Sequence, residues 1–64
     1  MRKILVDTKG DIKVQIYYSH QWNEYTVKLY IKGVYQTHSD YFTDDKQDAY
    51  DTAQHMLNNT KVEA

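Results

Sequence analysis

Histidine and aspartate are the residues in this sequence that could bind a metal ion or transfer a proton in catalysis. The histidines are His20, His38 and His55. No two of them have the i, i+4 spacing or another recognised spacing of metal ligands, so we expect three unrelated surface residues. The run Asp44-Asp45 with Asp48 lacks the alternating oxygen ligands, central glycine and terminal glutamate of a calcium loop. The sequence therefore predicts no metal site.

Covalent catalysis and phosphate binding also lack their usual signatures. The sequence has no Cys, and no Ser stands with a His and a carboxylate in an arrangement that indicates a nucleophile. Gly10 and Gly33 are single turn residues outside any phosphate-binding motif. A chain of 64 residues also has little room to enclose a pocket. We expect a protein that is not an enzyme, with no catalytic residues and no cofactor.

Tyrosine and lysine are the remaining residues that could carry a function, and their chemistry is that of binding. The sequence has seven Tyr but only one Phe and one Trp. Tyr offers a large contact area at low entropic cost and is enriched in the hot spots of interfaces. Which tyrosines a partner can reach depends on the elements that position them.

The length and composition predict one small domain that spans residues 1–64. The sequence is 41% hydrophobic and contains neither Cys nor Pro, so a disulfide framework is excluded. Only the three apolar residues Ile4–Val6 follow the N-terminal Met-Arg-Lys, which is too short a run for a signal peptide or a membrane span. We expect a soluble, cytoplasmic protein with no membrane partner.

The formal net charge of −1 conceals an asymmetry along the chain. Residues 1–33 contain six Lys or Arg and three acidic residues, whereas residues 34–64 contain two Lys or Arg and six acidic residues. The overall charge lacks the strongly basic balance that nonspecific nucleic-acid binding usually needs.

Hydrophobic periodicity predicts four strands, at about 3–7, 12–19, 24–32 and 34–42. The two central strands alternate clearly, with β-branched and aromatic residues on one side. These inward residues are Ile12, Val14, Ile16 and Tyr18, then Tyr25, Val27, Leu29 and Ile31. Gly10 and Gly33 mark the turns. The register of the last strand has two solutions. A two-residue turn places Gln36 and His38 inward, and a bulge, which we prefer, places Tyr35, Thr37 and Tyr41 inward.

A helix is predicted at about 44–58, followed by a polar tail at 60–64 that is expected to fray. Thr43 and Asp44 are both good N-caps, and Asp44 forms a capping-box pattern with Gln47. At 100° per residue the apolar side chains fall in one stripe. These are Ala49, Tyr50, Ala53, Met56 and Leu57. The predicted fold is α+β: an antiparallel sheet of three to four strands, the first one short, with one C-terminal helix packed on one face (β-β-β-β-α).

Two surfaces of this fold are candidates for binding. A single helix covers one side of a sheet, so the other side is left for solvent or a partner. The candidate residues there, with Trp22 at the loop edge, are Lys13, Tyr17, Trp22, Lys28, Tyr30 and Lys32. The outward side of the helix is acidic instead, through Asp44, Asp45, Asp48 and Asp51. Each surface also has an interpretation without a binding role. The sheet residues can be favourable cross-strand neighbours on a solvated face, and the acidic residues can form the solvated side of the helix.

Three resemblances bear on function. The segment "YTVKLYIKG…YFTDDKQDAYDTAQHML" resembles the last strands and final helix of double-stranded-RNA-binding domains, although that family has a Lys-rich start to this helix and the chain has Asp44-Asp45-Lys46-Gln47-Asp48. Over about 35 residues it also resembles the HicB-type antitoxin fold, with Asp48-Ala49…Ala53 in the helix. In size and Tyr content the chain resembles accessory proteins of phages and mobile elements, including anti-CRISPR-type inhibitors.

We therefore expect a small, non-enzymatic phage-type protein that binds and modulates or inhibits a host protein or complex in the host cytoplasm, as a monomer or a homodimer. Nucleic acid ranks second as the partner: Tyr17 and Tyr30 would stack on bases while Lys13, Lys28 and Lys32 meet phosphates. A structural, self-assembling role ranks third.

Overall fold

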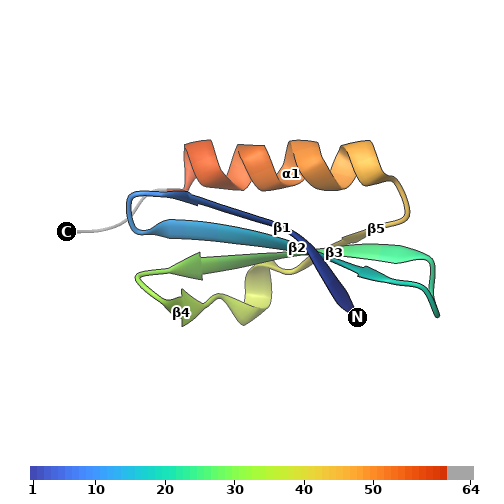
Figure 1. Cartoon of the computed structure of the whole chain (residues 1–64). Coiled ribbons are helices and arrows are strands. Elements are labelled where there is room, and N and C mark those ends of the chain that lie inside the picture. The colour runs from blue at the N-terminus through green and yellow to red at the C-terminus, as the bar shows by residue number, and fades with distance from the viewer. Residues whose placement is uncertain (61–64) are drawn as a thin grey trace.

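A computed structural model describes residues 1–60 and shows one antiparallel sheet with one helix across one of its faces (Figure 1). The strands in this part of the chain are β1 (Arg2–Lys9), β2 (Ile12–Ser19), β3 (Glu24–Ile31), β4 (Val34–Tyr35) and β5 (Tyr41–Thr43), and the helix is α1 (Lys46–Asn59). The strand order is β1-β2-β3-β4, and β5 also pairs with β3. The predicted α+β fold, an antiparallel sheet with a C-terminal helix, is confirmed.

The core lies between α1 and the inward side of β2 and β3. The two strands pair in one continuous register, from Ile12 opposite Ile31 to Ser19 opposite Glu24, so the alternation read from the sequence places all apolar positions on one side. The buried apolar residues are Ile12, Val14, Ile16, Val27, Leu29, Ala49, Ala53 and Leu57. Tyr25, Ile31, Tyr50 and Met56 pack against them and are partly buried. The predicted apolar stripe of the helix is confirmed.

The first strand is longer than predicted. β1 has eight residues, as many as β2, and it pairs with β2 as far as Lys9 opposite Ile12. The polar residues 7–9 are strand residues and not part of the turn, which consists of Gly10, with a φ of 58°, and Asp11. A strand at the edge of a sheet tolerates polar residues on both sides, so its polarity does not mark its end. A bulge near Ile4 interrupts the pairing close to the N-terminus.

The predicted continuous strand 34–42 is wrong, and so is the bulged register we preferred for it. Lys32 and Gly33 have φ values of 52° and 81° and form a two-residue turn that sets Ile31 opposite Val34. β4 then stops after two residues, and a short 3₁₀ helix at Thr37–Ser39 precedes β5. In Figure 1 the 3₁₀ helix lies on the side of the sheet away from α1.

The 3₁₀ turn shifts the register by three residues. Tyr30 pairs with Tyr35 and Val27 pairs with Tyr41, so three steps along β3 correspond to six steps along the opposing chain. Because an odd shift reverses the faces, Tyr35 lies with Tyr30 on the side away from α1, whereas Tyr41 lies on the helix side. Neither register considered from the sequence puts these two tyrosines on opposite sides.

The helix begins one residue later than a cap at Asp44 would allow. The N-cap is Asp45, whose Oδ1 accepts from the backbone N–H of Gln47 at 2.9 Å and of Asp48 at 3.4 Å. Thr43 Oγ1 accepts from the backbone N–H of Asp45 at 3.1 Å. The helix ends at Asn59, and the backbone N–H of Thr60 donates to the Met56 carbonyl. The rest of the tail expected to fray lies outside the described residues.

Replacing the observed cap should measurably destabilise the fold. We expect Asp45→Ala to lower the unfolding free energy by about 1 kcal/mol, because two helix N–H groups lose their acceptor. For a domain of this size that corresponds to a fall in Tm of about 4–8 °C. The control is Asp44→Ala, which removes a neighbouring exposed carboxylate. The measurement is thermal unfolding followed by circular dichroism. A larger fall in Tm for Asp44→Ala than for Asp45→Ala would contradict the assignment of Asp45 as the N-cap.

Candidate binding face

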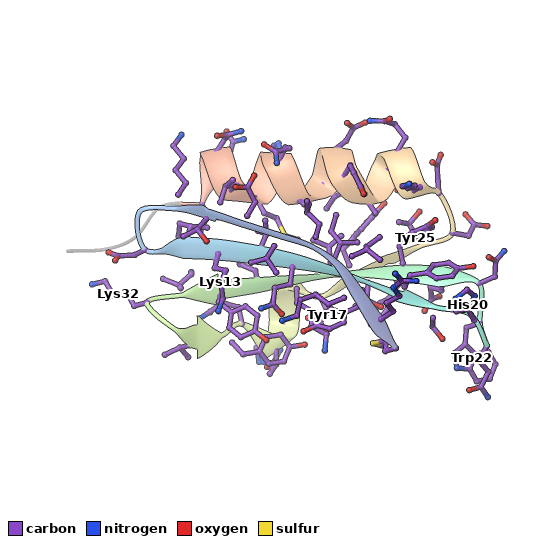
Figure 2. All side chains as sticks on the ribbon, viewed as in Figure 1. Lys13, Tyr17, His20, Trp22, Tyr25 and Lys32 are labelled. Atoms are coloured by element: carbon purple, nitrogen blue, oxygen red, sulfur yellow. The ribbon has the colours of Figure 1, made fainter. Side chains whose placement is uncertain are left out.

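The side of the sheet away from α1 carries three cross-strand rows of side chains. The first row is Thr8, Lys13, Tyr30 and Tyr35, the second is Val6, Gln15 and Lys28, and the third is Lys3, Tyr17, Thr26 and Phe42. Neighbouring residues in a row lie directly opposite each other on adjacent strands, so their side chains are within contact distance. We call Lys13, Tyr17, Lys28, Tyr30 and Tyr35 the Tyr/Lys face. Figure 2 shows its members Lys13 and Tyr17 on this side of the sheet.

Aromatic rings and ammonium groups interleave across the Tyr/Lys face. The Lys13 Nζ lies 4.8 Å from the ring centroid of Tyr30, and the rings of Tyr30 and Tyr35 are 5.2 Å apart at 34°. The Lys28 Nζ lies between two rows, 4.9 Å from the Tyr17 centroid and 5.4 Å from the Tyr35 centroid. Each ammonium–ring distance is within the range of a cation–π interaction, and the Tyr30–Tyr35 distance is that of an aromatic pair. The five side chains thus hold one another in place.

Two tyrosine hydroxyl groups are fixed by hydrogen bonds within the same face. The Tyr17 hydroxyl donates to Gln15 Oε1 at 2.6 Å, and the Tyr35 hydroxyl donates to Asp40 Oδ2. Gln15 and Thr26 are buried although they point away from the helix. The expectation that this whole face is open to solvent is therefore wrong at its centre, because the tyrosine rings cover the short polar side chains between them.

Asp40 sets the acid–base behaviour of Tyr35. The hydrogen bond to the Asp40 carboxylate, followed by partial burial and the negative charge of that carboxylate, raises the pKa of Tyr35 to about 12. The folded state therefore holds this proton more tightly than the unfolded chain, in which the pKa is about 10. The resulting stabilisation is complete below pH 10 and is lost as the pH rises toward 12.

This shift can be tested by tyrosine titration. In an ultraviolet titration of the folded chain, we expect one tyrosine to ionise near pH 12 and to disappear from that range in Tyr35→Phe. Asp40→Asn removes the carboxylate and should return the pKa of Tyr35 toward its ordinary value. Tyr41 adds a second high-pH component, because its hydroxyl donates to Asp48 at 2.5 Å and this bond also raises its pKa. A Tyr35 titration unchanged by Asp40→Asn would contradict the stated cause.

Exposed apolar and basic residues flank the Tyr/Lys face at both edges of the sheet. Val6 on β1 is 47% exposed, and Phe42 on β5 is 56% exposed. Lys3 on β1 lies opposite Tyr17 and is also exposed. The surface that a partner could contact therefore runs across all strands of the sheet, with the Tyr/Lys face at its centre.

Two of the sequence-predicted residues lie away from this centre. Trp22 is in the turn between β2 and β3, is 72% exposed, and projects from the end of the sheet in Figure 2. Lys32 is a turn residue at the opposite end, and its backbone N–H donates to the Asp11 carbonyl at 2.8 Å. The structure brings together Lys13, Tyr17, Lys28 and Tyr30, and does not bring Trp22 or Lys32 to them.

The four aspartates of the helix surface have different environments. Asp45 caps the helix, and Asp48 is half-buried and accepts from the Tyr41 hydroxyl. Asp51 is exposed and accepts from Gln47 Nε2 at 3.0 Å, while Asp44 is exposed. Asp45 and Asp48 therefore have structural roles, and Asp44, Asp45 and Asp51 are the exposed members of the acidic surface.

The principal residue that the sequence analysis missed is Tyr35, with its acceptor Asp40. The signal that could have found it is the dipeptide Lys32-Gly33: a two-residue turn places Ile31 opposite Val34 and hence Tyr30 opposite Tyr35. Asp40 has no comparable signal, because the 3₁₀ turn that brings it back to Tyr35 is not marked by a distinctive residue.

Within residues 1–60, no group of three or more His, Asp or Glu side chains is arranged to hold a metal ion. None of the helical segments in the same range is long and apolar enough to cross a membrane. Comparison of the chain with protein-family models, with curated proteins and with solved structures finds no match.

Proposed function

We propose that this chain is a small, non-enzymatic accessory protein of the kind that phages and mobile elements encode, and that it binds a host protein or complex through the Tyr/Lys face and modulates or inhibits it. The observation that carries the proposal is the interleaving of three tyrosine rings and two lysines on the face of the sheet that the helix leaves uncovered.

The arrangement suits recognition because the side chains are already ordered. Association normally costs free energy for each flexible side chain that becomes fixed at an interface. The rings of Tyr17 and Tyr35 are held by their hydroxyl hydrogen bonds and by Lys28, so little freedom remains to be lost. Tyrosines in such a rigid setting are typical binding hot spots.

The charge and polarity of the surface define the partner. Lys3, Lys13 and Lys28 give it positive charge, while the carboxylate of Asp40 is engaged by the Tyr35 hydroxyl. Val6 and Phe42 add exposed apolar area at the edges. A complementary partner surface carries acidic groups around an apolar centre, and opposite charges would accelerate association more than they deepen affinity.

A protein fits this face better than nucleic acid does. Proteins bind single-stranded nucleic acids by stacking the bases on exposed aromatic rings. The ammonium groups of Lys13 and Lys28 lie over the rings of Tyr30 and Tyr17, at 4.8 and 4.9 Å from the centroids, where a base would have to stack. Nucleic acid would have to displace both lysines, so it ranks second.

The test is affinity capture from host lysate with three forms of the tagged chain: wild type, the face variant Tyr17→Ala/Tyr30→Ala, and the helix variant Asp44→Ala/Asp51→Ala. A captured protein supports the proposal when its purified form binds the wild type and the helix variant in solution but not the folded face variant. Equal binding by all three forms would overturn the assignment of the face.

Two further measurements separate the alternatives. A gel shift at low salt that disappears as salt rises, and that is lost in the face variant, would show that the partner of the Tyr/Lys face is nucleic acid and not a protein. Sedimentation of the wild type alone reports self-association. A chain that assembles with itself through this face and retains no host protein would have the structural role instead.

A further inference from the structure

A hollow lies on the helix side of the sheet, at the end where α1 begins. Its volume is about 450 Å³, within the range of small-molecule sites. It is lined by the N-terminal end of β1, the end of the β2–β3 hairpin and the first turn of α1. The labelled residues His20 and Tyr25 mark this end of the sheet in Figure 2. The Tyr/Lys face is on the other side of the sheet, and of the residues that line the pocket only Lys3, next to the bulge in β1, also borders that face.

The charge of this pocket is positive. Arg2, Lys3 and Lys46 line it, together with the imidazole of His20. Among residues 1–60, none of the lining residues is acidic. Three basic side chains around one hollow, with no carboxylate between them, are the surroundings that a phosphate group needs.

The remaining walls are aromatic except for Ile4. Tyr18, Tyr25 and Tyr50 line the pocket, and the rings of Tyr18 and Tyr25 are 4.8 Å apart at 44°. The His20 ring, which also lines the pocket, packs nearly perpendicular to the Tyr18 ring, with the two centroids 4.8 Å apart. The Lys46 Nζ lies 5.7 Å from the Tyr50 centroid, so one cation is already placed beside an aromatic wall. Rings of this kind bind planar heterocycles by stacking.

We propose that this pocket binds a nucleotide, with the phosphate among Arg2, Lys3 and Lys46 and the base against the tyrosine rings. A bare inorganic anion would use the cations but leave most of the 450 Å³ and the aromatic walls without a contact. A nucleotide satisfies both halves of the pocket. The same chemistry is presented by a free nucleotide and by the 5′-phosphorylated end of a nucleic-acid strand.

The test is a titration of the ¹⁵N-labelled full chain followed by two-dimensional NMR, with 5′-AMP, adenosine and inorganic phosphate as probes. We expect AMP to shift the amide signals of residues that line the pocket, in a saturable way, and to bind more tightly than either fragment. The amides around Tyr30 and Tyr35, on the other side of the sheet, should not move. A lack of saturable shifts at millimolar AMP would overturn the proposal, and phosphate that binds as tightly as AMP would overturn the nucleotide assignment.

Matched variants test the residues. Arg2→Gln/Lys46→Gln should weaken AMP binding about tenfold or more, because two charge-assisted contacts are lost. Lys9→Gln/Lys32→Gln removes the same charge far from the pocket and should change the affinity by less than about twofold. All four side chains are exposed, so both variants are expected to keep the fold, which thermal unfolding checks. If both variants weakened AMP binding equally, the effect would come from the net charge of the chain, and the assignment of the pocket as the binding site would be wrong.

Two controls locate the source of the ligand and separate this proposal from the first. A short oligonucleotide with a 5′-phosphate, compared with its 5′-hydroxyl counterpart, shows whether a strand end binds as well as free AMP; binding of either supports the pocket. The face variant Tyr17→Ala/Tyr30→Ala should bind AMP like the wild type. A face variant that loses AMP binding while remaining folded would contradict a separate pocket.

Discussion

Ala53→Glu is expected to leave the chain unfolded at room temperature. Ala53 has no exposed surface and lies where α1 packs on the inner side of the sheet. A glutamate there must bury a charge without a partner, which costs about 3–5 kcal/mol, and must also displace well-packed neighbours. A domain of this size has a total stability of only about 3–5 kcal/mol, so one such change removes most or all of it. Circular dichroism of the purified variant measures the outcome.

The substitution isolates packing from helix propensity, because Ala and Glu are both good helix formers. The control is His55→Glu, which places the same side chain on an exposed position of the same helix. We expect it to shift the unfolding free energy by about 0.5 kcal/mol or less. A folded Ala53→Glu variant with the Tm of the control would contradict the docking of α1 on β2 and β3.

Tyr17→Ala/Tyr30→Ala is expected to abolish partner binding in practice. Truncation of a hot-spot tyrosine typically costs about 2 kcal/mol or more, which corresponds to roughly 30-fold in Kd for each residue. Each ring also holds a lysine, Lys28 over Tyr17 and Lys13 over Tyr30, so the truncations release Lys13 and leave Lys28 with its contact to Tyr35 alone. The combined effect should exceed the sum of independent surface changes. Isothermal titration with the purified partner measures it.

Tyr17→Phe is the matched control for this effect. It keeps the ring under Lys28 and removes only the hydroxyl that donates to Gln15. We expect Tyr17→Phe to retain most of the affinity, because contact area and not the hydroxyl carries the binding. A loss as large as that of the double alanine variant would show that the Gln15 hydrogen bond is what the partner depends on.

The part of the fold that could be predicted from the sequence is the part governed by strict alternation. β2 runs from Ile12 to Ser19 as predicted, because both of its neighbours are strands and one of its sides faces the core. The helix stripe of Ala49, Ala53 and Leu57 is predictable for the same reason: one side is buried and the other is not. Hydrophobic periodicity detects elements that have one buried side and one solvent-exposed side.

The parts that could not be predicted depend on pairing and not on periodicity. The last residues of β1 are polar, which an edge strand tolerates because its outer edge is open to solvent. Their polarity therefore resembles that of a turn, and the end of the strand is not visible in the sequence. The break between β4 and β5 arises because the chain inserts three extra residues opposite β3, and nothing in the sequence of Thr37–Ser39 requires it. Tyr35 joins the Tyr/Lys face through the two-residue turn at Lys32-Gly33, which the sequence offered as one of two registers. Its acceptor Asp40 follows the 3₁₀ turn, so this part of the face could not be predicted.

The long edge strand β1 has a consequence for how the chain behaves when it is crowded. An unpaired edge can recruit the edge of another molecule and start a continuous intermolecular sheet. If two copies of β1 met antiparallel about their midpoint, Arg2 of each would lie opposite Lys9 of the other, and the bulge near Ile4 would break the ladder twice. The strand is thus protected at both ends by like charge and within by its own irregularity, and the chain can expose a sheet edge without offering it for aggregation.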